Sequence, residues 1–157
     1  MVRFIRAGML VMAVGACGSL AGPLAAAQAS DATLLSTFKA ANTKLDRDEV
    51  KVGDGFVTYE LQNRSGPVIR ALRHEVGDIH ALTRKLKHES ASTANGRKGK
   101  ADIDAGLGLI AKVYGSLATD IQKAGTTPLA KSTVEAALKT DKKGRSKLLT
   151  GLKLLGG

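Results

Sequence analysis

The chain has 157 residues, and its 24 Lys and Arg residues outnumber its 14 Asp and Glu residues, which gives a formal net charge of +10. This length fits one domain and excludes a large two-domain enzyme. The single Cys excludes a disulfide scaffold, and a hydrophobic content of 43% indicates a folded chain. With three Phe, two Tyr and no Trp, the core must be mainly aliphatic, which favours helices.

Residues 1–29 have the pattern of a secretory signal peptide. Arg3 and Arg6 precede a short apolar run, and Ala27-Gln28-Ala29 offers the small residues that a signal peptidase reads. The apolar run is shorter than a membrane span, so we expect cleavage after the last of these alanines rather than a retained anchor helix. The protein is then exported, to the periplasm, the cell surface or the medium.

An alternative processing site lies inside this leader. The stretch Val14-Gly15-Ala16-Cys17 is similar to a bacterial lipobox, which would leave a chain lipidated at Cys17. The complete site at residues 27–29 favours ordinary cleavage. Loss of residues 1–29 removes the only Cys and all three Met, so the remaining domain, residues 30–157, has no thiolate nucleophile and no sulfur ligand for a metal.

The first predicted helix runs from Asp31 to about Asn63. Its apolar stripe recurs at intervals of seven, at Phe38, Leu45, Val52 and Tyr59. An alternative reading of residues 50–61 is a β-hairpin that turns at Gly53-Asp54-Gly55. We prefer the helix, because a lone hairpin would have no sheet to join.

The second predicted helix follows Ser65-Gly66-Pro67 and ends near His88. The residues expected on its buried face are Ile69, Leu72, Val76, Ile79, Leu82 and Leu86. Residues 90–100 are polar and rich in Gly and Lys, and they predict a mobile loop.

The third predicted helix has the most regular pattern. Its apolar positions alternate steps of four and three, at Ile103, Leu107, Ile110, Tyr114, Leu117, Ile121 and Ala124. Asp102 and Asp104 are expected in its first turn, and Gly125 ends it. Gly108 and Gly115 are seven residues apart, which suggests that a neighbouring helix approaches closely there.

The chain restarts at Thr127-Pro128 with a segment to Lys143, in which Val134 and Leu138 are apolar. Gly144 interrupts this segment, and the tail from Ser146 carries leucines at helical spacing. The sequence thus predicts an all-α, up-and-down bundle of four helices, or five if Gly144 divides the last. The basic tail is expected to cover the core; the alternative is that it lies on a membrane.

The histidines offer little support for catalysis. His74, His80 and His88 lie on one helix, and only His74 and Asp78 have the spacing to share a metal ion. The second His of the zinc-protease signature is missing, and no phosphate loop or nucleophile motif occurs. We therefore expect no enzyme, no cofactor and no metal site, with a His74–Asp78 metal binder as the weakest alternative.

The basic surface is the positive functional signal. The residues expected to bind polyanions are Arg97, Lys98, Lys100, Lys139, Lys142, Lys143, Arg145 and Lys147. Export argues against intracellular nucleic acid, so the expected partner is an anionic envelope polymer or lipid head groups. The alternative function is a structural or protein-interaction module of the envelope, in which apolar helix faces pair with another chain.

Overall fold

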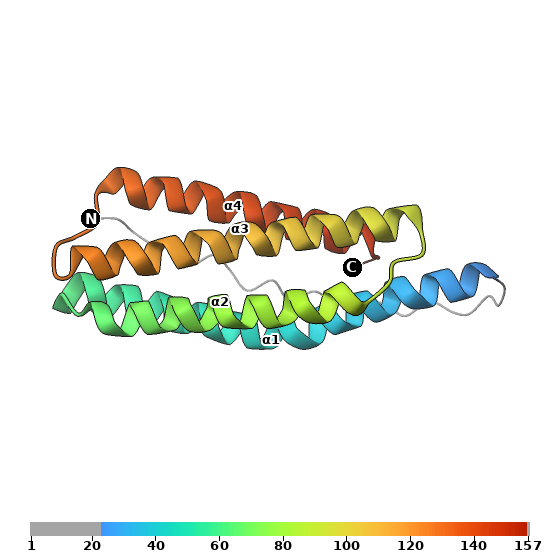
Figure 1. Ribbon diagram of the computed structural model, residues 1–157, viewed down its shortest axis with the longest axis horizontal. Helices are drawn as coiled ribbons and strands as arrows, with labels where there is room; N and C mark the ends of the chain where they lie inside the picture. The colour runs from blue at the N-terminus through green and yellow to red at the C-terminus, as the bar shows by residue number, and fades with distance from the viewer. Residues whose placement is uncertain (1–22, 157) are drawn as a thin grey trace.

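The computed structural model describes residues 23–156, with side chains from Ser30 onward, and shows four helices. They are α1 (Pro23–Gln62), α2 (Ser65–His88), α3 (Ala94–Ala124) and α4 (Lys131–Leu154). Successive helices run in opposite directions, and each packs mainly on its neighbour in the chain (Figure 1). The predicted all-α up-and-down bundle is confirmed, with four helices rather than five. Cys17 and most of the predicted leader lie outside the described residues.

The first helix is continuous through the region that allowed a hairpin. Both Gly53 and Gly55 lie inside α1, so the helical reading of residues 50–61 is confirmed. Gly55 is needed for packing, because a β-carbon on it would stand 2.7 Å from the Cα of Val68 in α2. The predicted apolar stripe of this helix is also confirmed. Leu45 is partly buried, and the three other residues of the stripe are buried, namely Phe38, Val52 and Tyr59.

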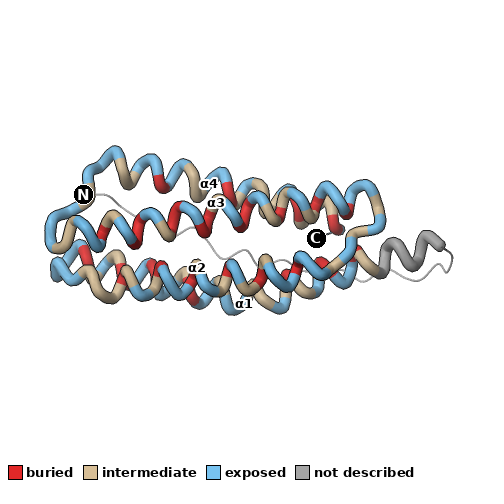
Figure 2. The backbone as a smooth tube through the Cα atoms, in the orientation of Figure 1, coloured by how far each residue is buried: buried red, intermediate tan, exposed pale blue. Residues whose placement is uncertain are grey.

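A seam of residues spaced alternately three and four apart runs along each helix and faces the core (Figure 2). Most positions are apolar, but the buried side of α1 includes Asp31 and Asp48, and that of α2 includes Glu75. In α4 the seam passes through Ala137, Asp141 and Gly144, so the carboxylate of Asp141 also comes from a seam position. The core therefore contains acids that must find partners.

The predicted loop at residues 90–100 is wrong for most of its length, because α3 begins at Ala94. Thr93 caps this helix, and its hydroxyl accepts a hydrogen bond from the Gly96 N–H at 2.8 Å. Asp31 of α1 accepts hydrogen bonds from the Ser92 N–H, at 3.1 Å, and from the Thr93 hydroxyl. The connection is short and tied to α1. The two acids expected in the first turn of α3 consequently lie well inside the helix.

The fourth helix continues through Gly144, so the predicted interruption there is wrong. Gly144 is buried, and a β-carbon on Gly106 of α3 would stand 2.7 Å from its carbonyl oxygen. Gly99 and Gly151 meet in the same way one heptad along. The close approach expected at Gly108 and Gly115 is therefore made by these other glycines, while those two face open space.

The end of α4 covers the core, as expected. Leu155 is buried, and Leu148 and Leu152 pack against the core cluster. Leu138, expected in the apolar face, is instead 44% exposed. Among the described residues, no helix combines the length and apolarity needed to cross a bilayer.

Candidate functional site

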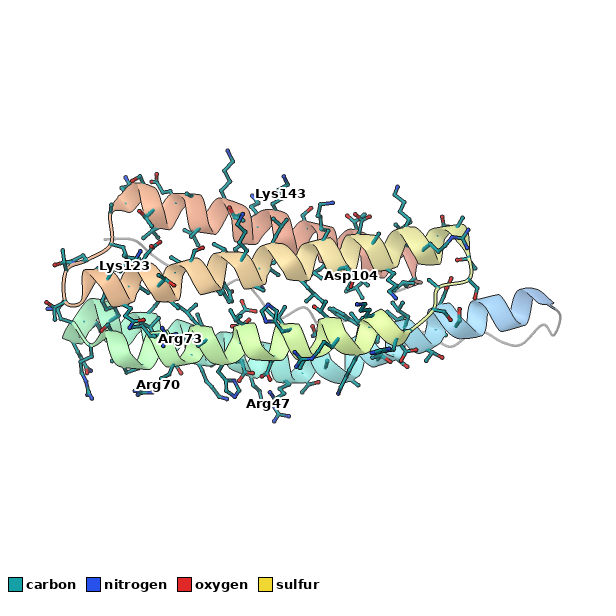
Figure 3. All side chains as sticks on the ribbon, viewed as in Figure 1. Arg47, Arg70, Arg73, Asp104, Lys123 and Lys143 are labelled. Atoms are coloured by element: carbon teal, nitrogen blue, oxygen red, sulfur yellow. The ribbon has the colours of Figure 1, made fainter. Side chains whose placement is uncertain are left out.

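The structure separates the predicted basic residues into an exposed group and a bonded group. Lys139, Lys142 and Lys143 are exposed, and in the heptad pattern of α4 they lie on the side opposite the seam. Figure 3 shows Lys143 pointing away from the bundle. Among residues 30–156, no ion pair is found for these three lysines. We call them the α4 lysine face.

The basic residues at the start of α3 are partly bonded to the backbone. Arg97 and Lys98 are exposed, and Arg97 donates a hydrogen bond to the Ser92 carbonyl at 2.6 Å. Lys100 donates to the carbonyl of Glu89. Because Gly99 packs on Gly151, this group lies beside the last turns of α4, roughly 12 Å along that helix from the α4 lysine face.

Arg145 and Lys147 hold the bundle together. Lys147 of α4 pairs with Asp102 of α3 at 3.2 Å. Arg145 is turned toward the core and has three partners on three helices: Asp141 at 2.7 Å, Glu49 of α1 at 3.0 Å, and the hydroxyl of Tyr114 in α3 at 3.0 Å. These two cations were expected to bind a polyanion; each forms ion pairs with acidic residues of the protein itself, and polyanion binding by them stays a prediction.

Glu75 completes this group, which we call the Arg145 cluster: Glu49, Glu75, Tyr114, Asp141 and Arg145. The side chain of Glu75 comes from α2 and is 4% exposed, and its Oε2 atom has no hydrogen-bond partner. Burial raises its pKa to about 8, and the charge of Glu49 adds to the effect while Arg145 opposes it. Glu75 is therefore mostly protonated at neutral pH.

The same surroundings also shift the pKa values of Tyr114 and Arg145. Burial raises the pKa of Tyr114, and the nearby carboxylate of Glu75 raises it further. Burial works against the charge of Arg145, yet its pKa is raised because Tyr114, Asp141 and Glu49 stabilise the guanidinium. Arg145 thus remains a cation that joins α4 to α1, two helices with little other contact.

The Arg145 cluster does not line either of two shallow grooves found among the described residues. One groove lies between α2 and α3, beside Val76, His80 and Gly108, and the other lies between α3 and α4. Both are open to solvent. Glu75 is not among the residues that line either groove.

A second polar group lies where α1 faces α2. The His74 Nδ1 atom is 3.4 Å from Oδ2 of Asp48 and 3.4 Å from Oδ2 of Asp78. Lys44 bonds to Asp78, and Lys51 donates to Asp48 Oδ1 at 2.8 Å. Burial opposes the charge of Asp48, but its contacts with Asp78 and Lys51 and the charge of His74 outweigh this and lower its pKa.

Sequence spacing pairs His74 with Asp78 but gives no role to Asp48 or Glu75. The predicted buried face of α2 contained Val76 rather than Glu75. A strict alternation of three and four from Leu72 leads to Glu75 and then Ile79. This three-and-four spacing identifies Glu75 as a buried acid from the sequence alone.

Comparison of the chain with models of protein families, with curated proteins and with solved structures found no match.

Proposed function

We propose that the protein is a non-enzymatic, exported bundle that binds an anionic component of the cell envelope through the α4 lysine face. The observation that carries the proposal is the distribution of charge along α4. Asp141 is the only acid from residue 139 to residue 157, and it points inward to Arg145. The three outer lysines therefore present positive charge on the outer side of α4, while the acid of the same turn is paired with Arg145.

Arg97 and Lys98 form a second exposed basic group, beside the last turns of α4. Their side chains are exposed, and the packing of α3 on α4 keeps them on a rigid element. Contacts of lysine with phosphate or carboxylate groups are electrostatic and weaken with salt. The support is thus exposed positive charge on a rigid scaffold.

The test compares two charge reversals of equal size. In the first variant Lys139, Lys142 and Lys143 become Glu; in the matched control Arg84, Lys85 and Lys87, all exposed on α2, become Glu. Circular dichroism verifies that both variants fold. Binding to vesicles of phosphatidylcholine with 30% phosphatidylglycerol, and to a soluble anionic wall polymer, is then measured at several salt concentrations.

The proposal requires a salt-sensitive loss of binding that is at least tenfold larger for the α4 variant than for the control. Equal losses would mean that only net charge matters, and binding that ignores salt would also contradict the proposal. Intact mass of the exported protein tests the location separately. A chain that begins at Ser30 supports cleavage after Ala29, and a lipid-bearing chain that begins at Cys17 supports anchoring.

One observation favours the alternative function as a protein-interaction module. Val50, Val57 and Leu61 lie on one stripe of α1 and are 63%, 55% and 79% exposed. Exposed apolar residues at this spacing are typical of a helix that pairs with another chain. Sedimentation of the purified protein distinguishes the two functions: a stable oligomer that Val57→Glu dissociates supports the module, and a monomer supports the binding bundle.

A further inference from the structure

The contact between α1 and α2 gathers three side chains that bind metal ions well. Asp48, His74 and Asp78 each offer one ligand atom, and these three atoms lie within 4.8 Å of one another. The chain supplies them from positions 26 and 30 residues apart, so only folding brings Asp48 to the other two. His74 and Asp78 share a helix face because they are four residues apart.

The Asp48 carboxylate has an unused oxygen directed at this group. The residue is 2% exposed, and its Oδ1 atom accepts a hydrogen bond from Lys51. Its Oδ2 atom, 3.4 Å from the His74 ring nitrogen, has no hydrogen-bond partner. An ionised carboxylate oxygen that accepts no hydrogen bond has a lone pair available for a cation placed between it and the His74 ring nitrogen.

The two distances from the His74 ring nitrogen match the coordination of a small divalent ion, and the two carboxylate oxygens lie within 4.8 Å of each other. Zinc binds imidazole nitrogen and carboxylate oxygen at about 2.0–2.1 Å, so two ligand atoms on a tetrahedral ion stand roughly 3.3–3.4 Å apart. Both distances from the His74 Nδ1 atom to the carboxylate oxygens are 3.4 Å. The His74 side chain is 56% exposed, which leaves room for a water molecule as the fourth ligand.

Lys44 competes for the same oxygens. Its ammonium group bonds to Oδ2 of Asp78 and lies 4.0 Å from Oδ2 of Asp48. The Lys44 side chain is 58% exposed, so it can turn into solvent when an ion takes its place. Lys51 would remain on the other oxygen of Asp48 and hold that carboxylate in orientation.

We propose that Asp48, His74 and Asp78 form a binding site for one divalent transition-metal cation, with zinc as the best match, and that Lys44 competes with the ion. This reverses the expectation from the sequence that the protein has no metal site. The proposal does not depend on the proposed function, because none of these residues belongs to the α4 lysine face. Metal binding here would link the middle of α1 to α2.

The test is calorimetric titration of the purified chain with zinc alone, after treatment with a chelator. The expected result is one ion per chain. His74→Ala and Asp78→Asn are expected to weaken binding at least tenfold, and Lys44→Ala is expected to tighten it several-fold because the competing cation is gone. His80→Ala is the matched control, since His80 is exposed on the same helix and lies outside the group.

Cobalt provides a second readout, because its visible absorption reports tetrahedral coordination. The wild type is expected to give that absorption, and His74→Ala is expected to lose it. Absence of heat at equimolar zinc overturns the proposal. So does a loss of affinity in His80→Ala equal to that in His74→Ala, or an affinity that Lys44→Ala leaves unchanged. Thermal unfolding of each variant without metal separates lost binding from lost folding.

Discussion

The backbones of Gly99 and Gly151 lie so close that a β-carbon on Gly151 would stand 2.5 Å from the carbonyl oxygen of Gly99. Gly106 and Gly144 repeat this contact seven residues away on both helices. The two contacts explain why α4, with three buried seam positions only, packs extensively on α3. Glycine is unfavourable inside a helix, so its presence here is a packing requirement.

This contact predicts opposite effects for two glycine substitutions. Gly151→Ala is expected to lower the free energy of unfolding by about 1–3 kcal/mol, because the added methyl group forces α3 and α4 apart. Gly115→Ala, at a position with nothing within 4 Å, is expected to raise it by up to about 1 kcal/mol. Urea unfolding followed by circular dichroism measures both. Equal effects would contradict the close packing.

The burial of Glu75 predicts a pH dependence of stability. Its pKa is about 8 in the folded protein and near the ordinary value for Glu in the unfolded chain. The folded state therefore holds the proton more tightly, and the associated stability is complete below about pH 4.5 and is lost as the pH rises toward 8. Glu75→Gln cannot ionise and is expected to be more stable than the wild type at pH 8, by roughly 2–4 kcal/mol.

Urea unfolding at several pH values, in a chelating buffer, checks this prediction. The difference between Glu75→Gln and the wild type is expected to grow between pH 5 and pH 8. Glu60→Gln is the control, because Glu60 is exposed on α1. A constant difference across this range, or the same slope in the control, would show that Glu75 does not titrate as described.

Arg145 is expected to be essential to the bundle, unlike its basic neighbours. Arg145→Met leaves Glu49 and Asp141 without their shared cation, which is expected to lower the free energy of unfolding by about 1–3 kcal/mol, because the ion pairs are only partly buried. Lys143→Met, on the exposed face of the same helix, is expected to change it by less than about 0.5 kcal/mol. Chemical denaturation compares the two, and Asp141→Asn combined with Arg145→Met is expected to recover part of the loss.

The tie between Asp31 and the start of α3 predicts a local effect. Asp31→Ala removes acceptors for the Ser92 N–H and the Thr93 hydroxyl, so residues 89–96 are expected to exchange their amide hydrogens faster. The expected loss of global stability is about 1–2 kcal/mol. Hydrogen exchange read by mass spectrometry locates the change. Ser36→Ala, at an exposed residue of the same helix, is expected to leave that segment protected.

The fold followed from apolar spacing because helices bury one face, and that rule needs no knowledge of distant partners. The stripes of Phe38 to Tyr59 and of Ile103 to Ile121 show this. The packing role of the glycines could not be predicted from apolar spacing. Gly99 and Gly144 were interpreted as loop and interruption, because their cost in a helix is visible in the sequence whereas the contact that offsets it comes from residues some 40 to 50 positions away.

The functional groups were harder to predict for a similar reason. Arg145 and Lys147 have the same local sequence character as Lys142 and Lys143, and only the positions of Glu49 and Asp102 separate bonded cations from exposed ones. Asp48 was missed as a ligand because its neighbours Asp46 and Glu49 made it part of an acidic run. Its seam position, three residues after Leu45 and four before Val52, distinguishes it.

The Arg145 cluster also determines how the helices align along their length. Apolar seams and paired glycines repeat every seven residues, so sliding one helix by a heptad would preserve much of that packing. The same slide would carry Arg145 about 10 Å from Glu49 and Tyr114 and leave partly buried charges unmatched. This cross-section of the bundle thereby favours one alignment among several of similar shape.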